Sequence, residues 1–176
     1  QALYEVFDAA VLHGGTCIWR CYGGNRFSED VDAYIPRNGG KLDEFFKALE
    51  KKGLAVERKK VSERSVYSTL RFNRTVVRFE AVFKKVAGSL KDYETAEGNF
   101  LTVYALTPEE LVAEKAAAYL NRLKVRDLYD VFFLLRYVKD VSRVRKPLEE
   151  LSTRFKEPVD EKELKVLILS GLVPSA

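Results

Sequence analysis

The sequence predicts an α+β fold, in which a small mixed β-sheet with flanking helices is followed by a helical lobe. Three features of the 176-residue chain indicate this fold. The segment SEDVDAYI, residues 28–35, alternates polar and apolar side chains, as a half-buried strand does. SVYSTLRF and TVVRFEAVF, residues 65–72 and 75–83, are separated by Asn73 and Arg74 and predict a hairpin. Beyond TPEE, a capping box at residues 107–110 with proline at the first helical position, the chain reads as helical.

The elements that precede the hairpin follow from turn residues and periodicity. Residues 4–12 predict the end of a helix that runs into a short apolar strand, and residues 16–22 predict a second helix after the glycines at 14 and 15. KLDEFFKALEKKG, residues 41–53, has apolar residues at helical spacing and a closing glycine, which predicts an amphipathic helix. Residues 54–61 predict a strand.

The remaining segments complete the expected order. Residues 87–99 are polar and contain glycines near both ends, which predicts a loop, and FLTVYAL, residues 100–106, predicts one more strand. We expect one compact unit with an α/β core at residues 1–106 and a helical lobe at residues 107–176. The active site is expected in the cleft between them.

Composition narrows the class of protein. No apolar run approaches the roughly 18 residues that span a bilayer, and no basic segment precedes an apolar one at the start, so no membrane or secretory segment is predicted. Cys17 and Cys21 form neither a disulfide framework nor a CxxC pair, which suits the cytoplasm. With His13 they recur at helical spacing, but helix packing explains them better than a soft-metal site. The net charge of +4 suits a polyanionic partner such as RNA, although solubility explains it nearly as well.

The stretch from Gly14 to Asp32 carries the clearest chemical signal. Gly14, Gly15 and Thr16 form a turn and helix start whose bare amides can approach phosphate. Asp30 and Asp32 project from one face of the predicted strand, with Cα atoms about 6.6 Å apart, so their charges repel unless a cation lies between them. Oxygen ligands of this kind select Mg²⁺ or Mn²⁺, which complete their coordination with substrate phosphates.

Three further residues extend this site. Glu80 alternates with the apolar face of its strand, so it can face the two aspartates and complete a site for two metal ions. Lys115 shares a helical stripe with apolar residues, an awkward place for a lysine unless an anion meets it. Asp127 lies on another such stripe, which predicts a part-buried and paired carboxylate. A hydrolase triad is poorly supported, because His13 is the single histidine of the chain.

Together these segments resemble a known family. GGT followed by RFSEDVD is similar to the first motif of the AbiEii-type nucleotidyltransferases, the abortive-infection or type IV toxins of the polymerase-beta-like superfamily. VRFE, residues 77–80, resembles the second motif of that family. Residues 114–134 resemble its long helical motif with a lysine and RDxxD. The pieces follow the family order over residues 12–137. His13 departs from it, because an apolar or basic residue is expected before the glycines.

The resemblance implies a nucleotidyltransferase core that transfers a nucleoside monophosphate from an NTP to an acceptor hydroxyl, with magnesium or manganese as cofactor. It implies an RNA acceptor, with the 3′ end of tRNA as a candidate, and a neutralising antitoxin partner. The implied roles are triphosphate binding by Gly14, Gly15 and Thr16, metal binding by Asp30, Asp32 and Glu80, phosphate contact by Lys115, a helical acidic role for Asp127, and phosphate contacts or ion pairs for Arg26 and Arg126.

Several alternatives stay open at this point. The aspartates can be solvated strand charges, Lys115 can extend its charge into water, and Asp127 can pair with Arg126 or cap a helix. The basic stretch at residues 56–64 fits a solvated strand face as well as an RNA contact. The whole chain can also be a nucleotide- or RNA-binding module with an inactive site, or an enzyme that modifies protein.

Overall fold

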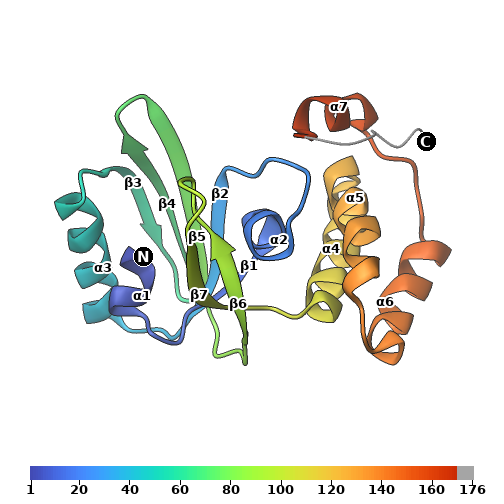
Figure 1. Ribbon diagram of the computed structural model, residues 1–176, viewed down its shortest axis with the longest axis horizontal. Helices are drawn as coiled ribbons and strands as arrows, with labels where there is room; N and C mark the ends of the chain where they lie inside the picture. Colours follow the sequence, from blue (N-terminus) through green and yellow to red (C-terminus); the bar gives the residue numbers. More distant parts are fainter. Residues whose placement is uncertain (170–176) are drawn as a thin grey trace.

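The computed structural model describes residues 1–169 and contains a seven-stranded mixed sheet with helices on both faces (Figure 1). The strands lie in the order β3-β4-β5-β2-β1-β7-β6. Neighbouring strands are antiparallel except for β1 with β7 and β2 with β5, which are parallel. The strand bounds are Val11–His13 for β1, Asp30–Ile35 for β2, Ala55–Val61 for β3, Ser65–Phe72 for β4, Thr75–Phe83 for β5, Ser89–Glu94 for β6 and Phe100–Ala105 for β7. The α+β fold class with a small mixed sheet is therefore confirmed.

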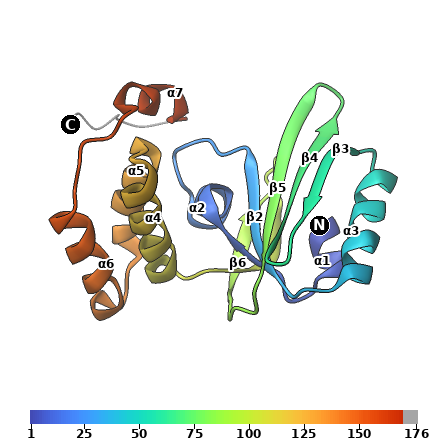
Figure 2. The ribbon, with the colours of Figure 1, turned by 180° about the vertical axis from the view of Figure 1, so that it is seen from behind.

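Helices cover the two faces of the sheet unequally. Helices α1 (Ala2–Val6) and α3 (Gly39–Lys51) lie on one face. Helix α2 (Gly14–Tyr22) lies on the other, between the sheet and α4 (Pro108–Arg122) with α5 (Val125–Leu134), as the two opposite views show (Figures 1 and 2). The chain ends with the 3-10 turn Leu135–Tyr137, α6 (Val141–Thr153), the 3-10 turn Glu161–Glu163 and α7 (Leu164–Leu167). None of the described helices combines the length and apolarity needed to cross a bilayer.

Local sequence signals explain where the main elements begin. Thr107 and Glu110 form the predicted capping box at the start of α4. Asn38 caps α3 by accepting a hydrogen bond from the Lys41 amide, and Gly53 follows that helix with a φ of 85°. Helix α2 begins at Gly14, two residues earlier than the sequence predicts, so both glycines belong to its first turn.

The loop predicted at residues 87–99 is wrong in part, because residues 89–94 form strand β6. This strand carries few apolar residues, but it pairs with β7 from Ser89 opposite Ala105 to Glu94 opposite Phe100. The Lys91 ammonium also lies 4.8 Å from the ring centroid of Tyr22 in α2. Backbone pairing with a neighbour stabilises a polar edge strand that periodicity alone does not reveal.

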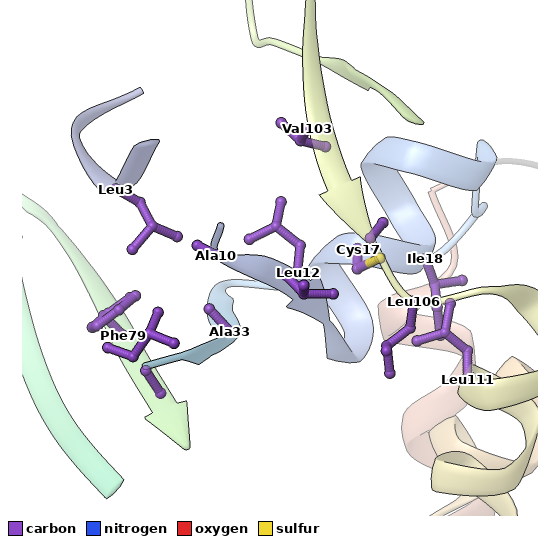
Figure 3. Close-up of a cluster of buried hydrophobic side chains, with 14 of the residues drawn as sticks. Leu3, Ala10, Leu12, Cys17, Ile18, Ala33, Phe79, Val103, Leu106 and Leu111 are labelled. Carbon is purple, nitrogen blue, oxygen red and sulfur yellow. The ribbon is translucent and has the colours of Figure 1, made fainter. Parts of the chain in front are cut away.

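The hydrophobic core is continuous from the sheet to α4. Figure 3 shows it from Leu3 and Phe79 at one end to Leu106 and Leu111 at the other, with Ala33, Leu12 and Ile18 between them. Ala33 is fully buried, as its alternation with the aspartates of β2 predicts. This packing fixes β2 and α2 against each other, and the polar residues that alternate with the core face the side of α4 and α5.

Candidate active site

The three predicted acidic ligands line one cleft. Asp30 and Asp32 lie on β2, and β5 runs parallel beside it. Glu80 of β5 is level with Asp32, which means that the two residues are partners in the strand register. All three side chains line a cavity of about 400 Å³, together with residues of α2, α4 and α5. The structure therefore brings together the carboxylates that the sequence places on separate strands. Their roles as metal ligands stay a prediction.

Burial and mutual repulsion disfavour the ionised form of two of these three carboxylates. Burial raises the pKa of the Asp32 carboxyl, and the Asp30 charge adds to the rise while His13 and Lys115 oppose it. The Glu80 side chain is exposed, yet partial loss of hydration and the charges of Asp32 and Asp30 raise its pKa as well. A bound cation would stabilise the ionised form of both carboxylates.

Asp30 differs from the other two because it already has a cationic partner. Arg78, two residues before Glu80 on β5, donates from Nε to Asp30 Oδ1 at 2.6 Å and from Nη2 to Oδ2 at 2.8 Å. The same Nη2 reaches Glu29 at 3.0 Å. Sequence reasoning missed this bidentate pair, although the in-register pairing of Asp30 with Arg78 follows once the two strands are parallel neighbours.

The residues fit a hard divalent cation, although they do not form a finished cage. Among residues 1–169, no three histidine, cysteine or acidic side chains are gathered closely enough to hold a metal ion. The carboxylates of Asp32 and Glu80 nevertheless present oxygen donors to the cleft, and release of Arg78 would add those of Asp30. Magnesium commonly takes only one or two protein carboxylates and keeps water or phosphate as its other ligands.

The glycine turn lies directly against Asp32. Gly14 has a φ of 71°, and a Cβ atom there would overlap Asp32 Oδ2 and lie 2.7 Å from Cγ and 2.9 Å from Cβ of Asp32. A Cβ on Gly15 would lie 2.7 Å from Nη2 of Arg26 and 2.6 Å from Oγ of Ser28. The first turn of α2 thus approaches Asp32 through Gly14, and Arg26 with Ser28 through Gly15, so closely that neither position accepts a side chain without displacement.

Thr16 joins α2 to the start of β2. Its hydroxyl donates to the backbone carbonyl of Asp30 and lies 3.2 Å from that of Ser28. The side chain is buried, so in this structure it holds the strand rather than facing a ligand. Its predicted contact with phosphate stays a prediction.

The wall opposite the acidic group carries a network of charges around two buried carboxylates, Asp127 and Asp130. Asp130 accepts Nε and Nη2 of Arg26 at 2.7 and 2.6 Å, and Lys115 Nζ lies 2.8 Å from its Oδ2. Asp127 accepts two hydrogen bonds from Arg122 and lies 3.4 Å from Lys115. Asp127 is thus paired as predicted, although with Arg122 and Lys115 instead of Arg126.

This network carries a net positive charge. Three cations, Arg26, Lys115 and Arg122, face two carboxylates, Asp127 and Asp130. Arg126 also lines the cleft, and no carboxylate of residues 1–169 forms an ion pair with it. Sequence reasoning missed Asp130 as the partner of Arg26 and Lys115. Its position as the second aspartate of RDxxD on α5 was the feature that could have indicated it.

A third cluster connects α4 to the sheet and was also missed. Glu114 accepts the Tyr34 hydroxyl and lies 3.2 Å from His13 Nδ1, while the rings of His13 and Tyr34 stack at 4.2 Å. His13 is level with Asp32 across β1 and β2. Although burial opposes ionisation, these hydrogen bonds lower the pKa of the Glu114 carboxyl. The cluster places Lys115, the next residue of α4, at the cleft.

Comparison with known proteins identifies the family. The family model for the nucleotidyl transferase AbiEii toxin of type IV toxin–antitoxin systems matches residues 1–169. No curated protein matches the chain.

Three solved structures share the fold at low sequence identity. A proposed nucleotidyltransferase from Helicobacter pylori aligns with a TM-score of 0.57 and 20% identity, over 90% of this chain and 72% of that one. JHP933 from Helicobacter pylori aligns with a TM-score of 0.53 and 20% identity, over 90% of this chain and 68% of that one. The antibiotic-resistance factor ANT(2'')-Ia aligns with a TM-score of 0.54 and 14% identity, over 88% of this chain and 89% of that one. With the family match along nearly the whole chain, the protein belongs to the AbiEii family of type IV toxin–antitoxin systems and is a nucleotidyltransferase.

Proposed function

We propose that the protein transfers a nucleoside monophosphate from an NTP to an acceptor hydroxyl with the help of magnesium or manganese ions. The observation that carries this proposal is the close approach of Gly14 to Asp32. A phosphate held by the amides at the start of α2 would lie beside the Asp32 carboxylate. Two anions at such a short distance need a cation between them, and the raised pKa of Asp32 agrees with that need.

Asp30, Asp32 and Glu80 would hold the metal ions, with Arg78 leaving the carboxylate of Asp30. When bound, the ions would lower the pKa of the attacking hydroxyl and offset the charge that develops as pyrophosphate leaves. Asp32 and Glu80 would orient the acceptor at the sheet side of the cleft. Partial burial of Asp32 lowers the effective dielectric around its carboxylate, which strengthens the electrostatic interactions there.

The positive wall would hold the triphosphate. Lys115 and Arg126 line the cleft opposite the acidic group, and the network around Lys115 carries one more positive than negative charge. A polyphosphate would complete that balance, with the backbone amides of Gly15 and Thr16 at its other end. Asp127 would act by fixing Arg122 and Lys115, because its fully buried carboxylate contacts both and does not reach the open cleft.

The biological setting follows from the family. We infer that the activity is toxic in the cytoplasm, that a partner antitoxin neutralises it, and that the acceptor is RNA, with the 3′ end of tRNA as the first candidate. Transfer to protein and nucleotide binding without turnover are the competing outcomes of the test.

The test uses magnesium, each α-labelled NTP in turn, total RNA and cell proteins. We expect the wild type to label RNA and release pyrophosphate, and Asp30→Ala/Asp32→Ala to do neither while it stays folded. The matched control is Asp92→Ala/Glu94→Ala, which removes two exposed carboxylates at the same spacing on β6. Labelled polypeptide would move the proposal to protein modification. Magnesium-dependent NTP binding with no label would indicate an inactive module.

A further inference from the structure

The sheet face that carries the acidic group continues without interruption to the edge strand β3. Asp32 is level with Glu80 on β5, Glu80 is level with Tyr67 on β4, and Tyr67 is level with Lys60 on β3. Paired residues at one level project from the same face of a sheet. These four side chains therefore form one row from the cleft to the edge of the sheet.

A second row runs beside the first. Asp30 is level with Arg78, Arg78 with Thr69, and Thr69 with Arg58. Each row spans three strand spacings, so its ends are about 14 Å apart. Both rows begin at a carboxylate of the cleft and end at a cation on the edge strand. The first row also carries an aromatic ring midway.

The residue between the two edge cations shows which face they occupy. Lys59 is paired with Asp43 of α3, at 3.0 Å, and its ammonium lies 4.4 Å from the ring centroid of Phe46. Lys59 therefore projects toward the face that α3 covers, and Arg58 and Lys60 project to the opposite face. Both are exposed, and within residues 1–169 no carboxylate forms an ion pair with either of them. Two cations on the neighbouring strands do have carboxylate partners, since Arg71 pairs with Glu57 and Arg78 pairs with Asp30.

Tyr67 gives this face an aromatic surface. Its side chain is half-buried, and the Thr69 hydroxyl lies 3.5 Å from its phenolic oxygen. Proteins commonly hold unpaired bases by stacking them on exposed aromatic rings beside cations that contact the backbone, because every base has a flat face that stacks. Cations alone would attract an acidic peptide as well, but such a peptide gains nothing comparable from the ring.

We propose that these two rows form the surface that binds the RNA acceptor of the proposed function. Its terminal hydroxyl lies at Asp32 and Glu80, a base near that end stacks on Tyr67, and backbone phosphates further along the strand contact Arg58 and Lys60. The proposal rests on the proposed function, since it assigns the acceptor side of the same reaction.

The test measures binding of a fluorescein-labelled single-stranded RNA to the full chain by fluorescence anisotropy, without NTP, at several salt concentrations. Arg58→Gln/Lys60→Gln removes the two edge cations. Lys47→Gln/Lys51→Gln is the matched control, because it removes two exposed lysines from α3 on the other face. Tyr67→Ala removes the ring, and Tyr67→Phe keeps it.

Loss of two phosphate contacts should reduce the slope of log K against log salt by about 1.4, and weaken binding about 25-fold at 0.1 M salt. Tyr67→Ala should weaken binding at least about fivefold, with Tyr67→Phe close to the wild type. The Lys47→Gln/Lys51→Gln control should bind RNA almost as the wild type does.

Binding of Mn²⁺–NTP, measured in parallel, should stay unchanged in all of these variants. The proposed binding surface is refuted if Arg58→Gln/Lys60→Gln and the α3 control bind RNA equally well. It is also refuted if the wild type does not bind the RNA and labels protein instead. If the wild type does not bind Mn²⁺–NTP, the result contradicts the proposed function itself.

Discussion

Replacement of Gly14 by alanine tests the contact on which the site depends. The residue has a φ of 71°, a region where a side chain costs about 1–2 kcal/mol. The new Cβ would also lie 2.9 Å from Cβ of Asp32, an atom that rotation of the aspartate side chain does not move. Strand β2 or helix α2 must therefore shift, at a cost of about 1–3 kcal/mol.

Gly23 provides a matched control for the backbone strain. It has a φ of 67° at the end of the same helix, and a Cβ there would meet no atom within 4 Å. Gly23→Ala should therefore cost about 1–2 kcal/mol, and Gly14→Ala about 2–5 kcal/mol. At about 2–4 °C per kcal/mol for a chain of this size, the melting temperatures of the two variants should differ by several degrees.

Activity should separate the two variants further. A displacement of about 1 Å in a catalytic group commonly costs about 100-fold in rate, so Gly14→Ala should lose pyrophosphate release by that factor while Gly23→Ala retains it. The measurements are thermal unfolding followed by circular dichroism and steady-state pyrophosphate release. If the two variants match in stability and in rate, then the close approach of α2 to Asp32 places no constraint on the site.

Three other substitutions probe the charges around the cleft. Arg78→Gln should tighten Mn²⁺ binding about two- to fivefold in calorimetry, because Asp30 loses a competing, part-exposed partner; weaker binding would show that Arg78 prepares Asp30 for the metal. Lys115→Met should lower the free energy of unfolding in urea by about 3 kcal/mol, because Asp127 and Asp130 stay buried with fewer partners, and an unchanged value would contradict that dependence. Burial opposes ionisation of Asp127, but Arg122 and Lys115 lower its pKa, so its stabilisation is present above about pH 4 and is lost as pH falls through the lowered value. Asp127→Asn should therefore weaken the acid dependence of stability, and an identical pH profile would refute this.

The parts of the site that are local in sequence could be predicted from it. Alternation places Asp30 and Asp32 on one face of β2, and the structure has both in one cleft. The capping box at Thr107 correctly locates the start of α4. Each of these features depends on backbone geometry within a few residues, which period and turn chemistry determine.

The partners that hold those residues could not be predicted, because they depend on which strands and helices become neighbours. Arg78 reaches Asp30 only because β5 lies parallel to β2. Asp130 meets Arg26 across more than one hundred residues of chain. Strand β6 carries no apolar alternation strong enough to signal it, and only pairing with β7 makes it a strand. Sequence reasoning therefore placed the two aspartates correctly on β2 and left their counter-ions unassigned.

The two sides of the cleft have opposite charge, and we expect this difference to favour one orientation of a bound nucleotide. Asp32 and Glu80 on the sheet side have raised pKa values and no cationic partner of the strength that Arg78 offers Asp30. Lys115 and its neighbours on the helical side have more positive charge than Asp127 and Asp130 balance. A metal–triphosphate complex carries both charges, so its metal would face β2 and β5 while its phosphates face α4 and α5. The reverse orientation would set phosphate against carboxylate and cation against cation, so we expect charge alone to favour one direction of binding before any contact with the base.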